Sequence, residues 1–307
     1  MTEYETYSLG DFTLQSGASI PSAHIAYQTF GSPALPTIIY PTWYSGAIAD
    51  NTWLIGADRA LDPAKFFIIV PALFGNGQSS SPSNTPARQP FPHVTFFDNV
   101  RAQHQLITQH LNISHAHAVL GWSMGAGQTY QWATQYPDFM DRIVPFCGSA
   151  RTSLHNQVFL EGVKSALLAP KGASSAGICA DNDARSRLWT EDEKATGLKA
   201  LGRVYAGWGF SQAFYREKLY LIAPAFKDQF KDLEDFMVEF WEKWATSKDP
   251  ENMLTMLWTW QAGDVSKQEP YRKAGDEGEN RDLSLLKNLL MVGVTDTSQT
   301  MQPSKPP

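Results

Sequence analysis

The feature that most constrains this chain is a glycine-flanked serine in the segment Gly121-Trp122-Ser123-Met124-Gly125. The apolar run before it, 115–120, is typical of a buried strand, and residues 124–135 predict a helix that ends at the Tyr136-Pro137 step. A tight turn from strand to helix strains the backbone of a serine and lifts its hydroxyl clear of the sheet. The sequence therefore predicts an α/β fold that presents Ser123 at the end of a strand.

Strands and helices alternate along residues 5–150. Apolar runs rich in β-branched and aromatic residues predict further strands at 37–40, 66–70 and 142–147. A helix capped by Asp98 or Asn99 would place a set of mainly apolar residues on one face: Val100, Gln103, Ile107 and Leu111. The alternation predicts a mostly parallel sheet with helices on both faces.

The strand signal disappears between residues 151 and 265. Helices are expected at 197–205 and 232–246, in a region rich in tryptophan. Two interpretations stay open: a helical insertion that packs its aromatic residues inward, or a helical lid that shapes a pocket over the sheet. A last strand is expected at 289–294. We therefore predict an α/β core formed by 1–150 and 266–307, with a helical lid insertion at 151–265.

Composition excludes several classes of protein. The 307 residues carry a net charge of −6, which disfavours nucleic-acid binding. No apolar run approaches the roughly 20 residues of a membrane span, and the acidic start is not a secretory signal. The two cysteines, Cys147 and Cys179, favour a reducing, cytoplasmic location, with a peroxisomal location as the weaker alternative. No metal-ligand motif or phosphate loop is present, so no cofactor is predicted.

The glycine-flanked serine indicates nucleophilic chemistry. The helix that follows would direct its first amides at the site, so the Met124 N–H is the expected first donor to an oxyanion. A second donor is expected from the loop 41–46 after an earlier strand, where we select the Tyr44 amide, with the Trp43 amide as the alternative. The competing interpretations are a glycine-rich turn needed only for packing and an ordinary aromatic loop.

Several separate sequence blocks occur in a fixed order along the chain. They are Asn-Thr-Trp-Leu-Ile-Gly at 51–56, Ala-Leu-Asp at 60–62, Leu-Phe-Gly-Asn-Gly-Gln-Ser-Ser-Ser-Pro at 73–82, Phe-Pro at 91–92, Asp-Asn-Val-Arg-Ala-Gln at 98–103, Gly-Trp-Ser-Met-Gly at 121–125, and Trp-Ala-Thr-Gln-Tyr-Pro at 132–137. On these blocks the chain resembles the homoserine O-acetyltransferase family of α/β-hydrolase proteins, and within it a fungal-type branch with members in secondary metabolism. The likeness extends over about residues 10–265.

The resemblance implies acyl transfer through an acyl-serine and a Ser–Asp–His triad. Ser123 is then the nucleophile, and Asp296, after the last predicted strand, is the carried-over acid, with Asp264 in reserve. The implied partner is a small-molecule acyl substrate, with acyl-CoA as a candidate donor. Nucleic-acid and membrane partners are not expected, and a homodimer stays open.

The histidine departs from the family pattern. Of the seven histidines only His155 follows Ser123, and none follows Asp296. His155 is the candidate base, and a pocket-lining or core histidine is its alternative interpretation. We expect the closing elements of the fold to be missing from this chain and the activity to be impaired. A non-catalytic binding protein and an incomplete product are the competing interpretations.

The expected substrate also differs from that of the family's acetyltransferases. Family acetyltransferases carry an Ala-Arg-containing helix in the insertion, and here the arginine of that stretch is displaced to Arg203. Homoserine is therefore disfavoured. The dense tryptophan and phenylalanine content favours a small hydrophobic acyl substrate.

Overall fold

The computed structural model describes residues 4–85, 91–172 and 188–269. The chain divides into two compact units, one of residues 1–152 with 258–307, the other of residues 153–257. The second boundary precedes the expected position after 265, because the residues just after it bond to the first unit. Thr259 Oγ1 donates to Val94 O (2.7 Å), and Thr152 Oγ1 donates to Trp260 O (2.6 Å).

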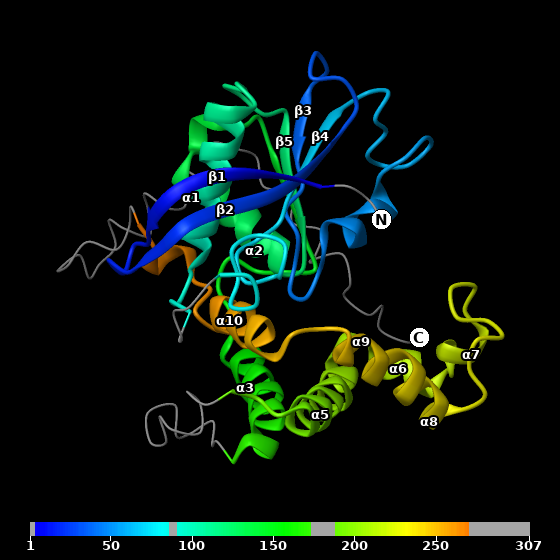
Figure 1. The fold of residues 1–307 in the computed structure, drawn as a ribbon. Coiled ribbons are helices and arrows are strands. Elements are labelled where there is room, and N and C mark those ends of the chain that lie inside the picture. Colours follow the sequence, from blue (N-terminus) through cyan, green and yellow to red (C-terminus); the bar gives the residue numbers. More distant parts are fainter. Residues whose placement is uncertain (1–3, 86–90, 173–187, 270–307) are drawn as a thin grey trace. The chain divides into compact units, whose positions relative to one another are not determined.

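The first unit is built on a sheet in which six strands are described, in the order β1-β2-β4-β3-β5-β6 (Figure 1). β3 pairs in parallel with β4 and β5, and β5 with β6, whereas β1 and β2 join as an antiparallel hairpin. The bounds are Glu5–Thr13 (β1), Ser19–Phe30 (β2), Thr37–Ile39 (β3), Phe67–Pro71 (β4), Ala118–Trp122 (β5) and Ile143–Phe146 (β6). The sheet is therefore mostly parallel, as the sequence predicts.

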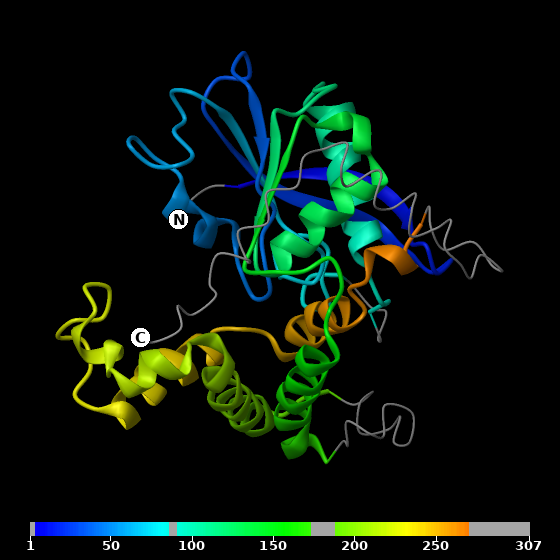
Figure 2. The same ribbon diagram turned by 180° about the vertical axis from the view of Figure 1, so that it is seen from behind.

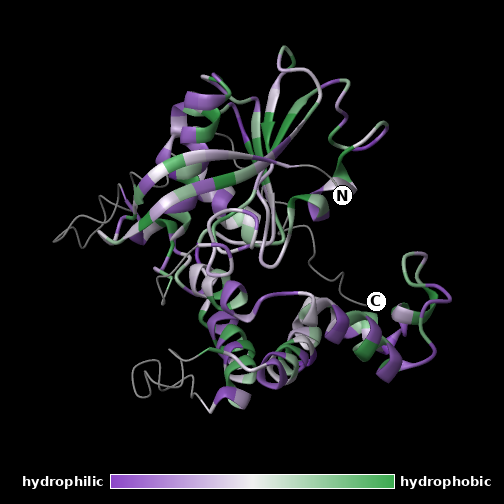
Figure 3. Ribbon diagram, in the orientation of Figure 1, coloured by the Kyte–Doolittle hydropathy of each residue, from purple (hydrophilic) through white to green (hydrophobic). Residues whose placement is uncertain are grey.

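Both faces of this sheet are covered. Helices α1 (Phe96–Gln105) and α2 (Met124–Gln135) pack on one face, where Val100 and Trp132 meet Ile39 and Ile69 (Figures 1 and 2). The opposite face packs against η1 (Ile48–Leu54). Neighbouring residues of β3 and β4 point to opposite faces, so both strands are buried and mostly apolar (Figure 3). Thr37 of β3 is the polar exception. The described residues of this unit also form three shorter helical segments: η2 (Leu106–His110), η3 (Pro137–Phe139) and η6 (Val265–Lys267).

The predicted elements of the core are largely confirmed. The helix at 124–135 has the predicted bounds, and the four predicted strands are present with ends shifted by one to three residues. The cap of α1 is a correction: Thr95 caps the helix, and Asp98 is the third helical residue, whose carboxylate accepts from Thr95 N at 3.1 Å. The Asp98 side chain therefore closes a capping box instead of standing at the N-cap.

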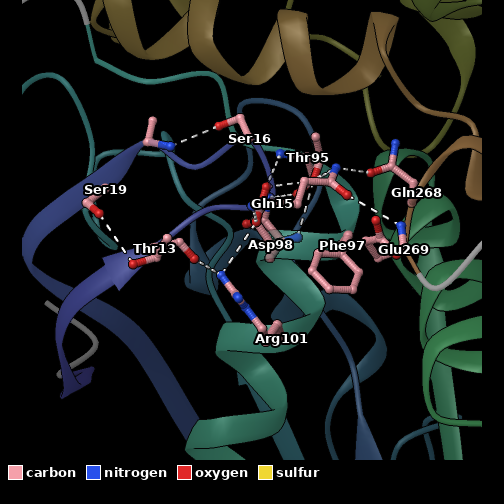
Figure 4. A network of polar contacts seen from close by, with 12 residues as sticks. Thr13, Gln15, Ser16, Ser19, Thr95, Phe97, Asp98, Arg101, Gln268 and Glu269 are labelled. Atoms are coloured by element: carbon pink, nitrogen blue, oxygen red, sulfur yellow. Dashed lines mark hydrogen bonds and ion pairs between the residues drawn. The ribbon is translucent and has the colours of Figure 1, made fainter. Parts of the chain in front are cut away.

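A partly buried polar network ties the hairpin to the start of α1 and to the last described residues (Figure 4). The Gln15 backbone N–H donates to Asp98 Oδ1 (2.7 Å). The side-chain amide of Gln15 donates to Thr95 Oγ1 (2.7 Å) and to Gln268 Oε1 (2.6 Å). Arg101 pairs with Asp98 and donates to Thr13 O. These bonds hold residues far apart in sequence within one unit.

The second unit is helical in its described residues. Its elements are α3 (Leu154–Leu168), η4 (Ala169–Lys171), α5 (Glu191–Gly209), α6 (Gln212–Arg216), α7 (Leu219–Ile222), α8 (Leu233–Phe236), η5 (Met237–Glu242), α9 (Lys243–Thr246) and most of α10 (Pro250–Gln261). An aromatic cluster around Phe236 and Trp241 packs inward. Trp258 and Trp260 lie instead in the first unit. None of the described helices has both the length and the apolar character needed to cross a bilayer.

Candidate active site

Ser123 lies at the turn between β5 and α2, in strained backbone geometry. Its φ is 56° and its ψ −122°, a region that non-glycine residues rarely adopt. The Ser123 N–H donates to Phe146 O of β6 (3.0 Å), and Ser123 O accepts from Ala126 N (2.9 Å). The side chain is half-buried. The turn is thus held on both sides while the serine keeps access to solvent.

Glycines allow the close packing that this turn requires. A methyl group added at Gly121 would lie 2.1 Å from Gly125 O and 2.4 Å from Thr129 Oγ1. At Gly148, which follows β6, it would lie 2.4 Å from Ser123 O. The glycines flanking the serine therefore bring strand and helix within backbone contact, as the motif predicts.

The loop after β3 lies beside the first turn of α2. A methyl group at Gly125 would lie 2.9 Å from Pro41 O, and Gln128 Nε2 donates to Thr42 O (2.8 Å). The N–H groups of Met124 and Trp43 have no hydrogen-bond acceptor among the described residues. The structure therefore brings Ser123, Met124 and the loop that carries Trp43 and Tyr44 to one place.

Aromatic rings gather next to the serine. The Trp122 ring, directly before Ser123, contacts Trp43 edge-on at 4.7 Å and Trp53 at 5.8 Å between ring centroids. Tyr44 is buried and packs on Trp260 at 5.6 Å. Trp53 keeps 49% of its surface exposed. An apolar, partly open surface therefore adjoins the turn.

The expected acids are not brought to the serine by any described contact. Asp296 lies outside the described residues. Asp264 caps η6, accepting from Ser266 N (3.0 Å) and Ser266 Oγ (2.6 Å), and pairs with Arg151 (3.2 Å). Its carboxylate is therefore engaged as a helix cap.

His155 belongs to the second unit, whereas Ser123 belongs to the first. It lies near the start of α3, is exposed, and its ring contacts Trp208 of α5 at 4.9 Å. This contact shows where the imidazole packs, and the role of His155 as base stays a prediction.

Histidines before the serine have structural partners. His115 Nε2 lies 2.8 Å from Asp141 Oδ1, and His117 Nδ1 lies 3.4 Å from Asp141 Oδ2. The hydrogen bond from His115 lowers the pKa of the Asp141 carboxyl. His104 stacks on Tyr136 at 3.9 Å, and burial lowers its pKa. These pairs with Asp141 indicate a structural role for His115 and His117.

A groove of about 440 Å³ lies in the second unit, between the start of α5 and the start of α10. Three of its charged side chains have partners: Lys194 pairs with Glu191 (2.9 Å), and Asp249 accepts from Glu251 N (2.9 Å) and Asn252 N (3.0 Å). Within residues 4–85, 91–172 and 188–269, no group of three or more His, Cys, Asp or Glu side chains could hold a metal ion.

Fold and site together define a nucleophile elbow, a serine at a strained strand-to-helix turn on a mostly parallel sheet. Residues 46–165 match the family model described as alpha/beta hydrolase fold. Ethyl acetate hydrolase of Pseudomonas veronii is 36% identical over 271 residues, which are 86% of this chain and 73% of that protein. An acetylester hydrolase from Corynebacterium glutamicum has a similar structure, with 34% identity, a TM-score of 0.77, and coverage of 86% of this chain and 74% of that one.

The chain belongs to the alpha/beta hydrolase family, and it is an enzyme, a hydrolase or acyltransferase. The expected likeness to homoserine O-acetyltransferases is narrower than the sequence predicts. That of Natronomonas pharaonis is 31% identical, but only over 49% of this chain and 43% of its own length.

One group of site residues was not predicted as such: the buried side chains that link the two helices to the loop after β3. Trp132 Nε1 donates to Gln103 Oε1 (2.8 Å), and Gln103 Nε2 donates to Gln128 Oε1 (2.6 Å). Gln128 in turn holds Thr42 O. A signal was present, because Gln103 falls on the predicted buried face of α1, where a polar side chain needs a partner.

Proposed function

We propose that this enzyme hydrolyses small esters with hydrophobic acyl groups through Ser123. The observation that carries the proposal is the strained backbone of Ser123 between β5 and α2, with φ 56° and ψ −122°. Proteins keep such strain chiefly where a side chain must be presented to a ligand. Relatives named as hydrolases of ethyl acetate and of acetyl esters support this assignment.

In the proposed reaction, Ser123 Oγ attacks the ester carbonyl carbon and gives its proton to a base. Negative charge develops on the carbonyl oxygen, where the Met124 N–H and an amide of the loop, Tyr44 or Trp43, would stabilise it. The alcohol leaves with a proton from the base, and an acyl-serine remains. Water, or another alcohol in acyl transfer, then attacks that intermediate and regenerates the serine. The sequence assigns the base to His155 and its orienting carboxylate to Asp296.

A neutral substrate suits the described charges. Arg203 is the arginine of the insertion that the resemblance to the acetyltransferases singles out. Its guanidinium donates hydrogen bonds to Glu242 (2.6 Å) and to Glu234 (2.5 Å). The hydrogen bonds that Arg203 donates to Glu234 and to Glu242 raise its pKa. Because this cation is already neutralised, we do not expect it to bind the carboxylate of an amino-acid substrate. The rings of Trp43, Trp53 and Trp122 favour an apolar ester.

Several finer expectations stay predictions: acyl-CoA as a donor, a homodimer, a cytoplasmic location, a lid function for the helical unit, and a role in secondary metabolism within a fungal-type branch. They follow from the resemblance and the composition alone.

The proposal is tested by steady-state kinetics on p-nitrophenyl acetate, butyrate and octanoate, on ethyl acetate, and on homoserine with acetyl-CoA. We expect turnover of the short esters, little acetylation of homoserine, and loss of ester turnover in Ser123→Ala by several powers of ten. Equal turnover by wild type and Ser123→Ala would overturn the proposal.

A further inference from the structure

The loop that carries the second oxyanion donor is held by three hydrogen bonds of Thr42. Thr42 N donates to Pro71 O (3.1 Å), and Thr42 Oγ1 accepts from Leu73 N (3.1 Å). Thr42 O accepts from Gln128 Nε2 (2.8 Å). Thr42 and Gln128 are both fully buried. The loop is thus fixed to the end of β4 on one side and to α2 on the other.

The bond from Gln128 also sets the direction of the next amide. Thr42 C=O and Trp43 N–H belong to one planar trans peptide, so they point in opposite directions. An amide side chain that holds Thr42 O therefore orients the Trp43 N–H away from itself. That N–H has no acceptor among the described residues, whereas Trp43 O accepts from Gly46 N (3.0 Å).

The orientation of the Gln128 amide is itself determined by its neighbours. The indole N–H of Trp132 can only donate, so Gln103 must turn its oxygen to Trp132 and its NH₂ to Gln128. Gln128 must then present its oxygen to Gln103 and its NH₂ to Thr42 O. All four residues are 0% exposed, so water does not compete for these bonds. The indole N–H of Trp132, at one end, thus fixes the donor-to-acceptor direction of this whole series of hydrogen bonds.

We propose that Gln128 is a positioning residue that orients the Trp43 N–H as an oxyanion donor for Ser123. This inference rests on the proposed function and deepens it, because it selects Trp43 over Tyr44 as the second donor. Gln128 lies on the same helix as Met124, the residue assigned the first donor, so one helix would set both amides.

The test replaces Gln128 by Met, which keeps the length of the side chain and removes its donor. Gln131→Met is the matched control, because Gln131 is on the same helix and equally buried, and its side-chain amide donates to Gln135 of that helix. We expect Gln128→Met to lower kcat for p-nitrophenyl acetate about 10- to 100-fold, below the 10²–10³-fold cost of losing a donor outright, with KM little changed. Gln131→Met should keep wild-type kinetics.

Two inhibitors distinguish a loss of Trp43 N–H positioning from a general loosening of the site. Phenylboronic acid forms a tetrahedral adduct on the serine, whereas 1-butanol reports ground-state binding. Gln128→Met should lower the affinity for phenylboronic acid by about the same factor as kcat, and it should leave the affinity for 1-butanol unchanged. Gln128→Glu provides a rescue, because a buried, protonated carboxyl can donate to Thr42 O. Its activity relative to wild type should rise as the pH falls.

Wild-type kcat and phenylboronic acid affinity in folded Gln128→Met would overturn the inference and leave the proposed function standing. If Gln128→Met does not fold, Gln128→Glu decides, and a ratio to wild type that is independent of pH overturns the inference. If the wild type neither hydrolyses p-nitrophenyl acetate nor binds phenylboronic acid, the proposed function fails and this inference fails with it.

Discussion

Replacing Gly121 by alanine perturbs the turn at its tightest contact. The added methyl group would lie 2.1 Å from Gly125 O, where ordinary contacts begin at 3.4 Å, so the two backbones must separate by about 1.3 Å. The blocking atoms belong to the backbone of α2 and cannot rotate away. Ser123 and Met124 lie between these glycines and must move with them. A displacement of about 1 Å at a reacting group costs roughly 100-fold in rate.

We therefore expect Gly121→Ala to lose about 100-fold in kcat/KM on p-nitrophenyl acetate. Overpacking should also lower the free energy of unfolding by about 1–3 kcal/mol or more. Kinetics and urea denaturation measure the two effects. Gly207→Ala on α5 is the control, because a methyl group there meets nothing within 4 Å and should be neutral or stabilising. Wild-type activity and stability in Gly121→Ala would refute the reasoning from close packing.

Three further predictions concern the surrounding structure. Asp98→Ala removes a buried carboxylate that accepts from Gln15 N (2.7 Å) and closes the cap of α1, so urea denaturation should show a loss of about 2–4 kcal/mol; a loss below about 0.5 kcal/mol would contradict it. Burial lowers the pKa of His104, so the unfolded state binds more protons below about pH 6.5 and stability falls as the pH drops. His104→Phe should reduce that slope between about pH 7 and pH 5, and unchanged slopes would rule this out. Arg203→Gln breaks the pairs with Glu234 and Glu242 and should lower the melting temperature without changing KM for p-nitrophenyl acetate; a large rise in KM would instead place Arg203 at the substrate.

The elements nearest the serine could be predicted because their signals are local. The bounds of α2 follow from the glycine-flanked turn at one end and the Tyr136-Pro137 step at the other. Strands β3 and β4 are buried on both faces and therefore read as continuous apolar runs.

The hairpin β1–β2 escaped prediction for the opposite reason. Residues of β1 are mostly exposed, and bulges at Gly10 interrupt its register with β2, so no regular apolar pattern marks the strand. The cap of α1 was misplaced because Thr95, Asp98 and Asn99 are all good capping residues, and the structure selects Thr95 through its capping box with Asp98.

The residues of the site also fall into two groups, one that could be predicted from local sequence and one that could not. Ser123 and Met124 are defined by their neighbours in sequence, whereas the chain from Trp132 through Gln103 to Gln128 joins separate elements. Its hydrogen bonds span 29 and 25 positions, and a further bond to Thr42 spans 86. A sequence shows that a buried glutamine needs a partner, but the partner is supplied only by the packing of α1, α2 and the loop.

The most direct test of the account is the reaction of a fluorophosphonate probe with the folded protein, followed by mass spectrometry of its peptides. Attack by an activated serine, with its oxyanion held by the adjoining amides, predicts one equivalent of probe on Ser123 and none in Ser123→Ala. A well-folded protein that takes up no probe, or takes it up equally after Ser123→Ala, would contradict the account.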